Sequence, residues 1–256
     1  MKKYINKLLT LSKETAFEAI DKLRELDENG MKEYSFSSDI PREIKAMADT
    51  VIEDLILKQL TLTGIDIISE ESGFIKGNKV STLRFIVDPI DGSVNFVRGI
   101  LNCSVSIALF DGDKAIFGVL ASYPSGDITW GGKEIGAFCE NAKLRVSTVD
   151  NPKKGVLCTG FPSRFSFETK SIASQIDLMS KFSKTRMIGS ASQSLLLLAK
   201  GSIEYYTEQE IMLWDVAAGI AIVEGAGGRV KKIDGLSNGS LNIIADNGKI
   251  DLNIIY

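Results

Sequence analysis

Histidine is absent from this chain of 256 residues. It is a frequent general base of serine and cysteine hydrolases and the commonest metal ligand. Its absence therefore excludes Ser-His-Asp and Cys-His enzymes, histidine phosphatases, HExxH proteases and His-ligated metal centres. Hydrolysis by this chain would have to use carboxylates, hydroxyls, lysine or a hard metal ion.

Cysteine is scarce, and its spacing carries no motif. Cys103, Cys139 and Cys158 form no CxxC pair, so we expect neither a disulfide framework nor a zinc site, and we expect a reducing compartment. The N-terminus carries polar and acidic residues, unlike a signal peptide. No apolar stretch approaches the roughly 20 residues that span a bilayer. We therefore expect a cytoplasmic protein without a membrane partner.

Neither sign of charge is in large excess. Lys and Arg total 30 against 33 Asp and Glu, a formal charge of −3, so we expect no nucleic-acid partner. The hydrophobic fraction of 44% and the charged fraction of 25% are typical of a globular protein. At this length the chain could form one large domain or two lobes that share an interface.

Two kinds of periodicity divide the first half of the chain. Apolar residues recur at helical spacing over 5–23 and 44–56, which predicts two N-terminal helices. Short β-rich runs separated by turn residues follow, and they predict a large, mostly antiparallel sheet. The expected strands are 65–69, 83–88, 103–110, 115–122, 127–130 and 136–139.

The second half alternates strands with helices. The expected strands are 155–160, 185–188, 203–206 and 241–246, and the expected helices are 168–183, 190–200 and 215–226. This alternation predicts a second, smaller sheet with flanking helices, and so a layered α/β architecture. With a soft boundary at 147–153, we expect an N-terminal α+β lobe over 1–150 and a C-terminal α/β lobe over 151–256.

Acidic residues follow or open several of these elements. An apolar strand runs into Asp88 and Asp91, a strand upstream ends at Glu70 and Glu71, and Asp215 opens a helix of small residues. Taken singly, each acid fits a turn, a helix cap or a solvated loop equally well or better. Gathered in a partly dry site, carboxylates need cations, and oxygen ligands alone select Mg²⁺ or Mn²⁺.

The motifs around these acids resemble the inositol monophosphatase family of Mg²⁺-dependent phosphomonoesterases. The sequence is particularly similar to the archaeal-type members that also accept fructose 1,6-bisphosphate. The resemblance implies an αβαβα sandwich whose N-terminal lobe holds most of the metal ligands. The matching segments are IISEESG (67–73), DPIDGSVNFVRGI (88–100), GSASQSLLLLAKGSIEYY (189–206), WDVAAGIAIVEGAGGRV (214–230) and LNIIADN (241–247).

The resemblance assigns roles to individual residues. It implies two or three Mg²⁺ ions, with Mn²⁺ as a possible substitute, and catalysis by a metal-activated water with Ser93, Asp49 and Glu70. The implied metal ligands are Glu70, Asp88, the Ile90 carbonyl, Asp91 and Asp215. The implied substrate contacts are Gly92, Ser93, Gly189, Ser190, Ala191, Glu208 and Asp215. A homodimer is also expected.

The chain departs from the family pattern in two places. Ser93 stands where the family usually has threonine, and we expect its hydroxyl to donate a proton toward Asp49. Ala46 and Ala48 stand where the family often has hydroxyls, whereas Asp49 and Glu53 fit its D-x-x-x-E spacing on one helical face. Glu53 fits a structural acid on a solvated face at least as well as a catalytic one. The segment 35–43, which precedes this helix, matches the family loop poorly.

The sequence leaves the substrate open. Glu208 fits a sugar-binding carboxylate and an ordinary loop residue equally well, and Arg98, Arg164 and Arg186 could meet a second phosphate or lie on the surface. We expect a small phosphorylated polyol or sugar. Fructose 1,6-bisphosphate and a 3′(2′),5′-bisphosphate nucleotide are the alternatives. The alternative outside enzymes is a silent metal-dependent binding or regulatory homologue.

Overall fold

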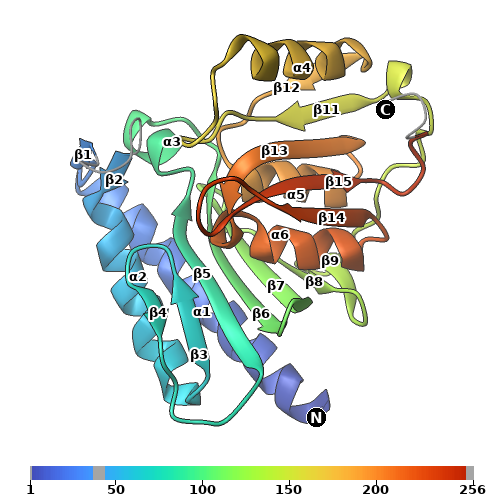
Figure 1. The fold of residues 1–256 in the computed structure, drawn as a ribbon. Helices are drawn as coiled ribbons and strands as arrows, with labels where there is room; N and C mark the ends of the chain where they lie inside the picture. The colour runs from blue at the N-terminus through green and yellow to red at the C-terminus, as the bar shows by residue number, and fades with distance from the viewer. Residues whose placement is uncertain (1, 37–43, 252–256) are drawn as a thin grey trace.

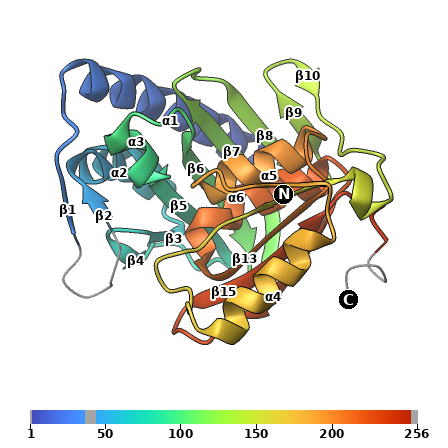
Figure 2. The same cartoon turned by 90° about the horizontal axis from the view of Figure 1, so that it is seen from above.

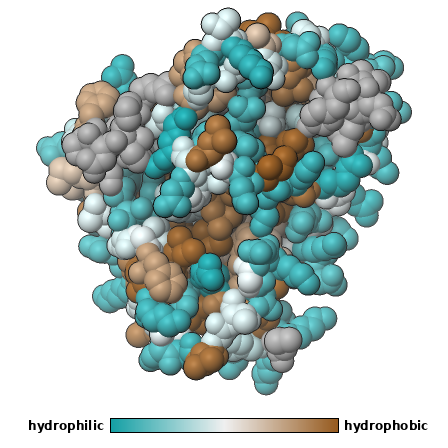
Figure 3. Space-filling view, viewed as in Figure 1, coloured by the Kyte–Doolittle hydropathy of each residue, from teal (hydrophilic) through white to brown (hydrophobic). Residues whose placement is uncertain are grey.

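The computed structural model describes residues 2–36 and 44–251, and side chains from residue 46 in the second range. These residues form five layers: two helices, a large sheet, two further helices, a second sheet and one outer helix (Figures 1 and 2). Hydrophobic side chains on the face in Figure 3 gather near its middle, and hydrophilic ones cover much of its periphery. The layered αβαβα architecture expected from the sequence is confirmed.

The first layer is made by α1 (Lys2–Glu28) and α2 (Met47–Leu60). Both helices bury one apolar face, which includes Ile20 and Leu23 on α1 and Ile52 and Ile56 on α2. These faces pack with one side of the large sheet in a single hydrophobic cluster. The burial of this continuous apolar surface holds the first layer in place.

The large sheet has eight strands in the order β10-β9-β8-β7-β6-β5-β3-β4. Neighbours are antiparallel except β3 and β5, which are parallel. The central strands are almost wholly buried because helices cover both faces. The strands are β3 (Asp66–Ser69), β4 (Gly73–Ile75), β5 (Leu83–Asp91), β6 (Cys103–Asp111), β7 (Lys114–Tyr123), β8 (Ile128–Gly132), β9 (Gly136–Cys139) and β10 (Ala142–Lys143).

The middle layer consists of α5 (Ala191–Ala199) and α6 (Leu213–Gly225), which fill the space between the two sheets (Figure 1). Helix α6 is buried along most of its length, and its small residues allow a close approach to the large sheet. A Cβ at Gly118 in β7 would lie 2.2 Å from the Ala218 carbonyl oxygen. Backbone therefore packs directly on backbone at this crossing.

The second sheet has five strands in the order β12-β11-β13-β15-β14, and α4 (Thr169–Ser180) covers its outer face. Its first three strands are parallel and the last two pairings are antiparallel. The strands are β11 (Val156–Thr159), β12 (Lys184–Arg186), β13 (Tyr205–Met212), β14 (Arg229–Asp234) and β15 (Ser240–Asp246). The remaining elements are β1 (Tyr34–Phe36), β2 (Ile44–Ala46), η1 (Thr61–Thr63), α3 (Ser93–Arg98) and η2 (Pro152–Lys154).

The structure corrects several predicted bounds. The expected helix over 44–56 was wrong at its start, because residues 44–46 pair with β1 and Ala46 has extended backbone at the helix cap. Strand β13 extends to Met212, six residues beyond its predicted end. The short edge strands β4 and β10 were not predicted, and neither was the charged strand β14. Residues 37–43 of the expected loop lie outside the described residues.

Division into lobes over 1–150 and 151–256 stays a prediction. Helices of the second half and strands of the first half belong to one hydrophobic cluster, which includes Ile86 and Leu120 as well as Val216 and Ile220. Over residues 2–36 and 44–251, no helix is both long enough and apolar enough to cross a membrane.

Replacing Gly118 by alanine tests the contact between β7 and α6. We expect Gly118→Ala to lower the free energy of unfolding by about 2–3 kcal/mol, because backbone atoms on both sides would have to move apart. Gly219→Ala should lower the free energy of unfolding less, because its new Cβ meets the Leu195 side chain and not backbone. The higher helix propensity of alanine also offsets about 1 kcal/mol of the loss. Urea unfolding measures both variants, and equal losses would contradict this account.

Candidate active site

Strand β5 presents both of its aspartates because it contains a bulge. Asp88 pairs with Ser106 of β6 and Asp91 pairs with Ser104, so three steps along β5 match two along β6. Residues three apart on a regular strand point to opposite faces of the sheet, and one extra residue restores the same face. The bulge lies at Pro89 and Ile90, so it brings the two side chains to one side of the sheet.

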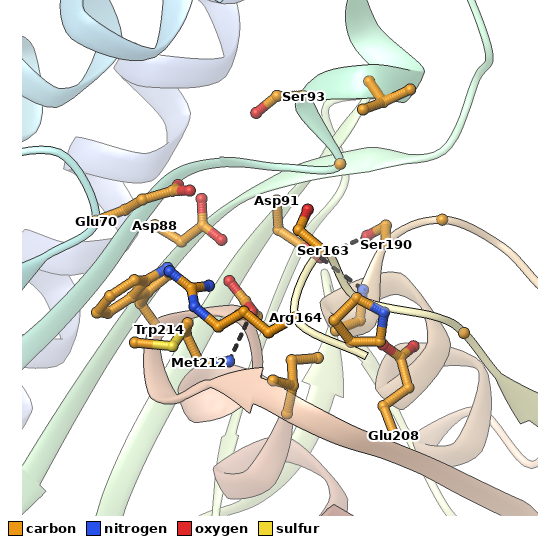
Figure 4. A pocket seen from close by; sticks show the side chains of 18 of the residues that line it. Glu70, Asp88, Asp91, Ser93, Ser163, Arg164, Ser190, Glu208, Met212 and Trp214 are labelled. Atoms are coloured by element: carbon orange, nitrogen blue, oxygen red, sulfur yellow. Dashed lines mark hydrogen bonds between the residues drawn. The ribbon is translucent and has the colours of Figure 1, made fainter. Parts of the chain in front are cut away.

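The register of β3 brings Glu70 beside Asp88. Ser69 pairs with Val87 in the parallel ladder, and the Glu70 amide donates to the Val87 carbonyl oxygen at 3.2 Å. Glu70 is therefore the next residue in register with Asp88. This register places the two carboxyl groups beside each other at the edge of the cavity (Figure 4).

A second bulge directs Asp215 toward the same place. The pairing of β13 with β15 shifts between Glu208 and Ile211, and Glu210 has the left-handed φ of 57°. The Glu210 carboxylate accepts from the amides of Leu236 and Ser237 and from the Ser240 hydroxyl. This bulge leads directly into α6, whose first turn contains Asp215.

These elements enclose a cavity of about 230 Å³ (Figure 4). It is lined by residues of β5, the following Gly-Ser turn, the loop after β11, the start of α5, β13 and the start of α6. The sequence-predicted residues that line it are Glu70, Asp88, Ile90, Asp91, Gly92, Ser93, Gly189, Ser190, Ala191, Glu208 and Asp215. Asp49 contacts this set through Ser93 and does not itself line the cavity.

Burial and mutual repulsion dominate the electrostatics of the cavity. Burial, then the charges of Asp215 and Asp49, raise the pKa of Glu70 well above its usual range. Burial, then the charges of Glu70, Asp91 and Asp215, raise the pKa of Asp88 in the same way. Carboxylates that oppose each other's ionisation in this manner form a site that favours bound cations.

Asp91 differs from its neighbours because it is well supplied with donors. One carboxylate oxygen accepts from the hydroxyls of Ser190 and Ser192 and from the Ser192 amide, and the other accepts from the Ala191 amide. The Ser192 hydroxyl is in turn hydrogen-bonded to the Ser104 hydroxyl, with 2.5 Å between the two oxygens. Burial raises the pKa of Asp91, and these hydrogen bonds oppose the rise.

The donor set fits a hard divalent ion. Asp88 Oδ1 is buried without a hydrogen-bond partner, and an unpaired oxygen in this position costs free energy unless a proton or cation approaches it. Among the described residues, no three acidic or cysteine side chains already converge as the ligands of one ion. Asp91 instead accepts from serines, and Asp215 accepts from the Met212 amide at 3.0 Å. The ligand roles stay predictions.

Ser93 and Asp49 are in hydrogen-bond contact. Ser93 Oγ lies 3.1 Å from Asp49 Oδ1 and 2.9 Å from the Ile90 carbonyl oxygen, and its single proton serves one of these acceptors at a time. The other Asp49 oxygen accepts from the Ala46 amide and caps α2. The helix start therefore fixes the acceptor for the Ser93 hydroxyl.

Glu208 lies at the opposite end of the cavity from Glu70 (Figure 4). A Cβ at Gly160 would approach its carboxylate to 2.6 Å, so only glycine leaves room for the acid under this loop. Gly189 has a φ of 77°, and Asn95 donates to the neighbouring Ile188 carbonyl oxygen. The Gly189–Ala191 strip is thus tied to the helix that follows the Gly-Ser turn.

Of the three arginines that the sequence left open, only Arg164 lines the cavity. Figure 4 shows its side chain reaching in from the loop after β11, with its charged end toward Asp88 and Trp214. Arg98 and Arg186 are exposed and do not line the cavity. The motifs missed Phe161, Pro162 and Met212 as lining residues, because nothing in their local sequence marks them.

The layered fold and its carboxylate-lined cavity define a class: metal-assisted hydrolases of small anionic esters. Residues 5–254 match the model of the inositol monophosphatase family, and the chain belongs to that family. Its members are phosphoric monoester hydrolases and are generally Mg²⁺-dependent. The family, the fold class and the enzyme class predicted from the sequence are confirmed.

Named relatives cover most of this chain. An inositol-1-monophosphatase of Mesorhizobium japonicum is 31% identical over 78% of each chain. A fructose-1,6-bisphosphatase/inositol-1-monophosphatase of Thermotoga maritima is 32% identical over 83% of this chain and 79% of its own length. The crystal structure of the extragenic suppressor protein suhB from Bartonella henselae superposes with a TM-score of 0.84 at 29% identity, over 94% of both chains.

The pH dependence of stability tests the environment of Glu208. Burial, then the charge of Asp91, raises its pKa to about 8 from 4.5. Between these values the folded state binds a proton that the unfolded state has lost, so stability falls as pH rises from about 4.5 to about 8. In metal-free buffer we expect the free energy of unfolding of Glu208→Gln to exceed that of the wild type by at least about 1 kcal/mol near pH 8.

This advantage should shrink toward pH 5, where Glu208 is protonated in the folded wild type. Urea unfolding of both proteins across this pH range measures the difference. A difference that stays constant with pH would contradict the shifted pKa and leave only a packing effect of the substitution.

Proposed function

We propose that this protein hydrolyses the phosphate monoester of a small polyol or sugar, with two or three Mg²⁺ ions and with Mn²⁺ as a substitute. The observation that carries the proposal is the approach of Glu70, Asp88 and Asp215 to one cavity beside the Gly92–Ser93 turn. Oxygen donors of this kind prefer Mg²⁺. When bound, Mg²⁺ would supply the positive charge that stabilises the phosphoryl oxygens and acidifies water.

The chain itself supplies orientation and a proton path. Ser93 Oγ holds its proton within reach of Asp49, so its lone pairs are available to orient a water at the mouth of the Gly-Ser turn. Glu70 lines the same cavity, where its carboxylate is placed to accept a proton from water during turnover. No covalent phosphoserine is required by this arrangement.

The cavity favours a compact substrate. Its volume of about 230 Å³ lies below the ~300–1,000 Å³ of sites for drug-sized ligands, so it suits one ring and one phosphate group. Glu208 and the Gly189–Ala191 strip line its far end, where they would meet ring hydroxyls. A 3′(2′),5′-bisphosphate nucleotide is bulkier and fits this volume less well.

A second candidate activity is fructose 1,6-bisphosphate hydrolysis. Arg164 favours it, because among the described lining residues it is the one cationic side chain in an otherwise acidic cavity. A guanidinium group suits a second phosphate. A silent binding homologue has less support, since every proposed ligand and Ser93 is a residue type that the reaction can use. Homodimer formation and a cytoplasmic location stay predictions.

A phosphate-release screen with saturating Mg²⁺ tests the proposal. We expect a polyol or sugar monophosphate to react fastest, fructose 1,6-bisphosphate next and an adenosine bisphosphate least. Chelation should abolish turnover, Mn²⁺ should restore it, and Ca²⁺ should not, since its larger and looser coordination suits the site poorly. Full activity after exhaustive chelation would overturn the proposal.

Ser93→Ala should lower kcat by about 10²–10³-fold and leave KM nearly unchanged, because the hydroxyl would act mainly in the transition state. Ser125→Ala, on a surface turn, is the matched serine control and should behave as wild type. Unchanged turnover in Ser93→Ala, or a phosphoserine trapped at position 93, would contradict the assigned role.

A further inference from the structure

Glu53 is a buried acid in α2 whose carboxylate is saturated with donors. It is 3% exposed. Its Oε1 accepts from the Glu71 amide at 3.2 Å, the Ser72 amide at 3.1 Å and the Ser69 hydroxyl. Its Oε2 accepts from the Ser72 hydroxyl at 2.5 Å. The position that the sequence left between a structural and a catalytic acid is therefore neither solvated nor part of the cavity lining.

All four donors belong to residues that flank Glu70. Ser69 precedes it at the end of β3, and Glu71 and Ser72 follow it in the turn to β4. The two turn amides point inward to the Glu53 carboxylate, so the chain reversal is closed by a side chain from another element. Glu70 lies between the bonded residues, and its own amide is held by Val87.

This bonding fixes how Glu70 faces Asp88. The ladder to β5 fixes the backbone before Glu70, and Glu53 fixes the backbone after it. Because the backbone is held on both sides of Glu70, this residue loses little further conformational entropy when its side chain binds an ion. Without the Glu53 carboxylate, the two amides and two hydroxyls would hydrogen-bond to water. The direction of the Glu70 side chain would then no longer be fixed.

We propose that Glu53 is the positioning residue for Glu70: through the Ser69–Ser72 segment it sets the affinity of the site for Mg²⁺. The inference rests on the proposed function, because Glu70 is taken as a metal ligand. Asp49 lies one turn earlier on α2, so one helix orients two walls of the cavity, Glu70 through Glu53 and Ser93 through Asp49.

The test compares Glu53→Ala with Glu53→Gln. Alanine removes every acceptor. Glutamine keeps one oxygen for the two amides and the Ser69 hydroxyl, and its amide group can donate to the Ser72 hydroxyl, which then acts as acceptor. If orientation matters and charge does not, glutamine should preserve function that alanine loses.

Two readouts are measured over a range of Mg²⁺ concentrations: the rise in melting temperature and the rate of phosphate release. In Glu53→Ala we expect half-saturation by Mg²⁺ to shift upward by about tenfold or more in both readouts. The KM for substrate at saturating Mg²⁺ should change far less. Glu53→Gln should stay within about threefold of the wild type.

Two further variants complete the design. Ser72→Ala removes one bond at an exposed residue and should shift half-saturation in the same direction by about threefold, even if Glu53→Ala fails to fold. Glu204→Gln is the control: Glu204 is also buried and accepts from a backbone amide, that of Val156, but it lies outside the cavity. It should leave the Mg²⁺ response unchanged.

The outcomes separate this inference from the proposed function. A wild type without Mg²⁺-dependent phosphatase activity would end the proposed function itself. A functional wild type whose Mg²⁺ half-saturation is unchanged in a folded Glu53→Ala, or in Ser72→Ala if the former does not fold, would overturn the role of Glu53 alone. An equal loss of Mg²⁺ affinity in Glu53→Gln and Glu53→Ala would also overturn it, since the charge of Glu53, and not its hydrogen bonds, would then determine the affinity.

Discussion

Repulsion between Glu70, Asp88 and Asp215 is the constraint on which the rest of the site depends. Burial and neighbouring charge, including that of Asp215, oppose the ionisation of Glu70 and Asp88, and one oxygen of Asp88 has no hydrogen-bond partner. A folded chain does not gather such groups without stabilisation from elsewhere. The stabilisation comes from the buried layers, which supply the apolar packing that holds the strand and helix ends together.

The elements around the cavity orient acids mainly with neutral donors. Asp91 accepts from serine hydroxyls and amides, Glu53 accepts from the turn around Glu70, and Glu210 accepts from the loop after β14. Hydroxyls and amides fix the direction of a carboxylate without cancelling its full charge. The charge therefore stays available for a cation, and the geometry that receives the cation is already present in the fold.

Much of the fold and site followed from local patterns. Helical periodicity located α1 and most of α2, and the DPIDGS and WDVAAG segments identified three acids that line the cavity, Asp88, Asp91 and Asp215. The bulges at Ile90 and Glu210 could not be predicted, since they arise from pairing with distant strands. The role of Glu53 was hidden for the same reason, because its partners lie 16 to 19 residues away on another element.

Melting of wild type and Asp88→Asn with and without Mg²⁺ tests the central claim most directly. Asp91 is less suited to this test, because asparagine there would lose hydrogen bonds from Ser190 and Ser192. The account predicts that metal-free Asp88→Asn is at least as stable as the wild type, since one repelling charge is gone, and that its Mg²⁺-induced rise in melting temperature is largely lost. A variant that melts several degrees lower without metal, yet keeps the full Mg²⁺ response, would contradict it.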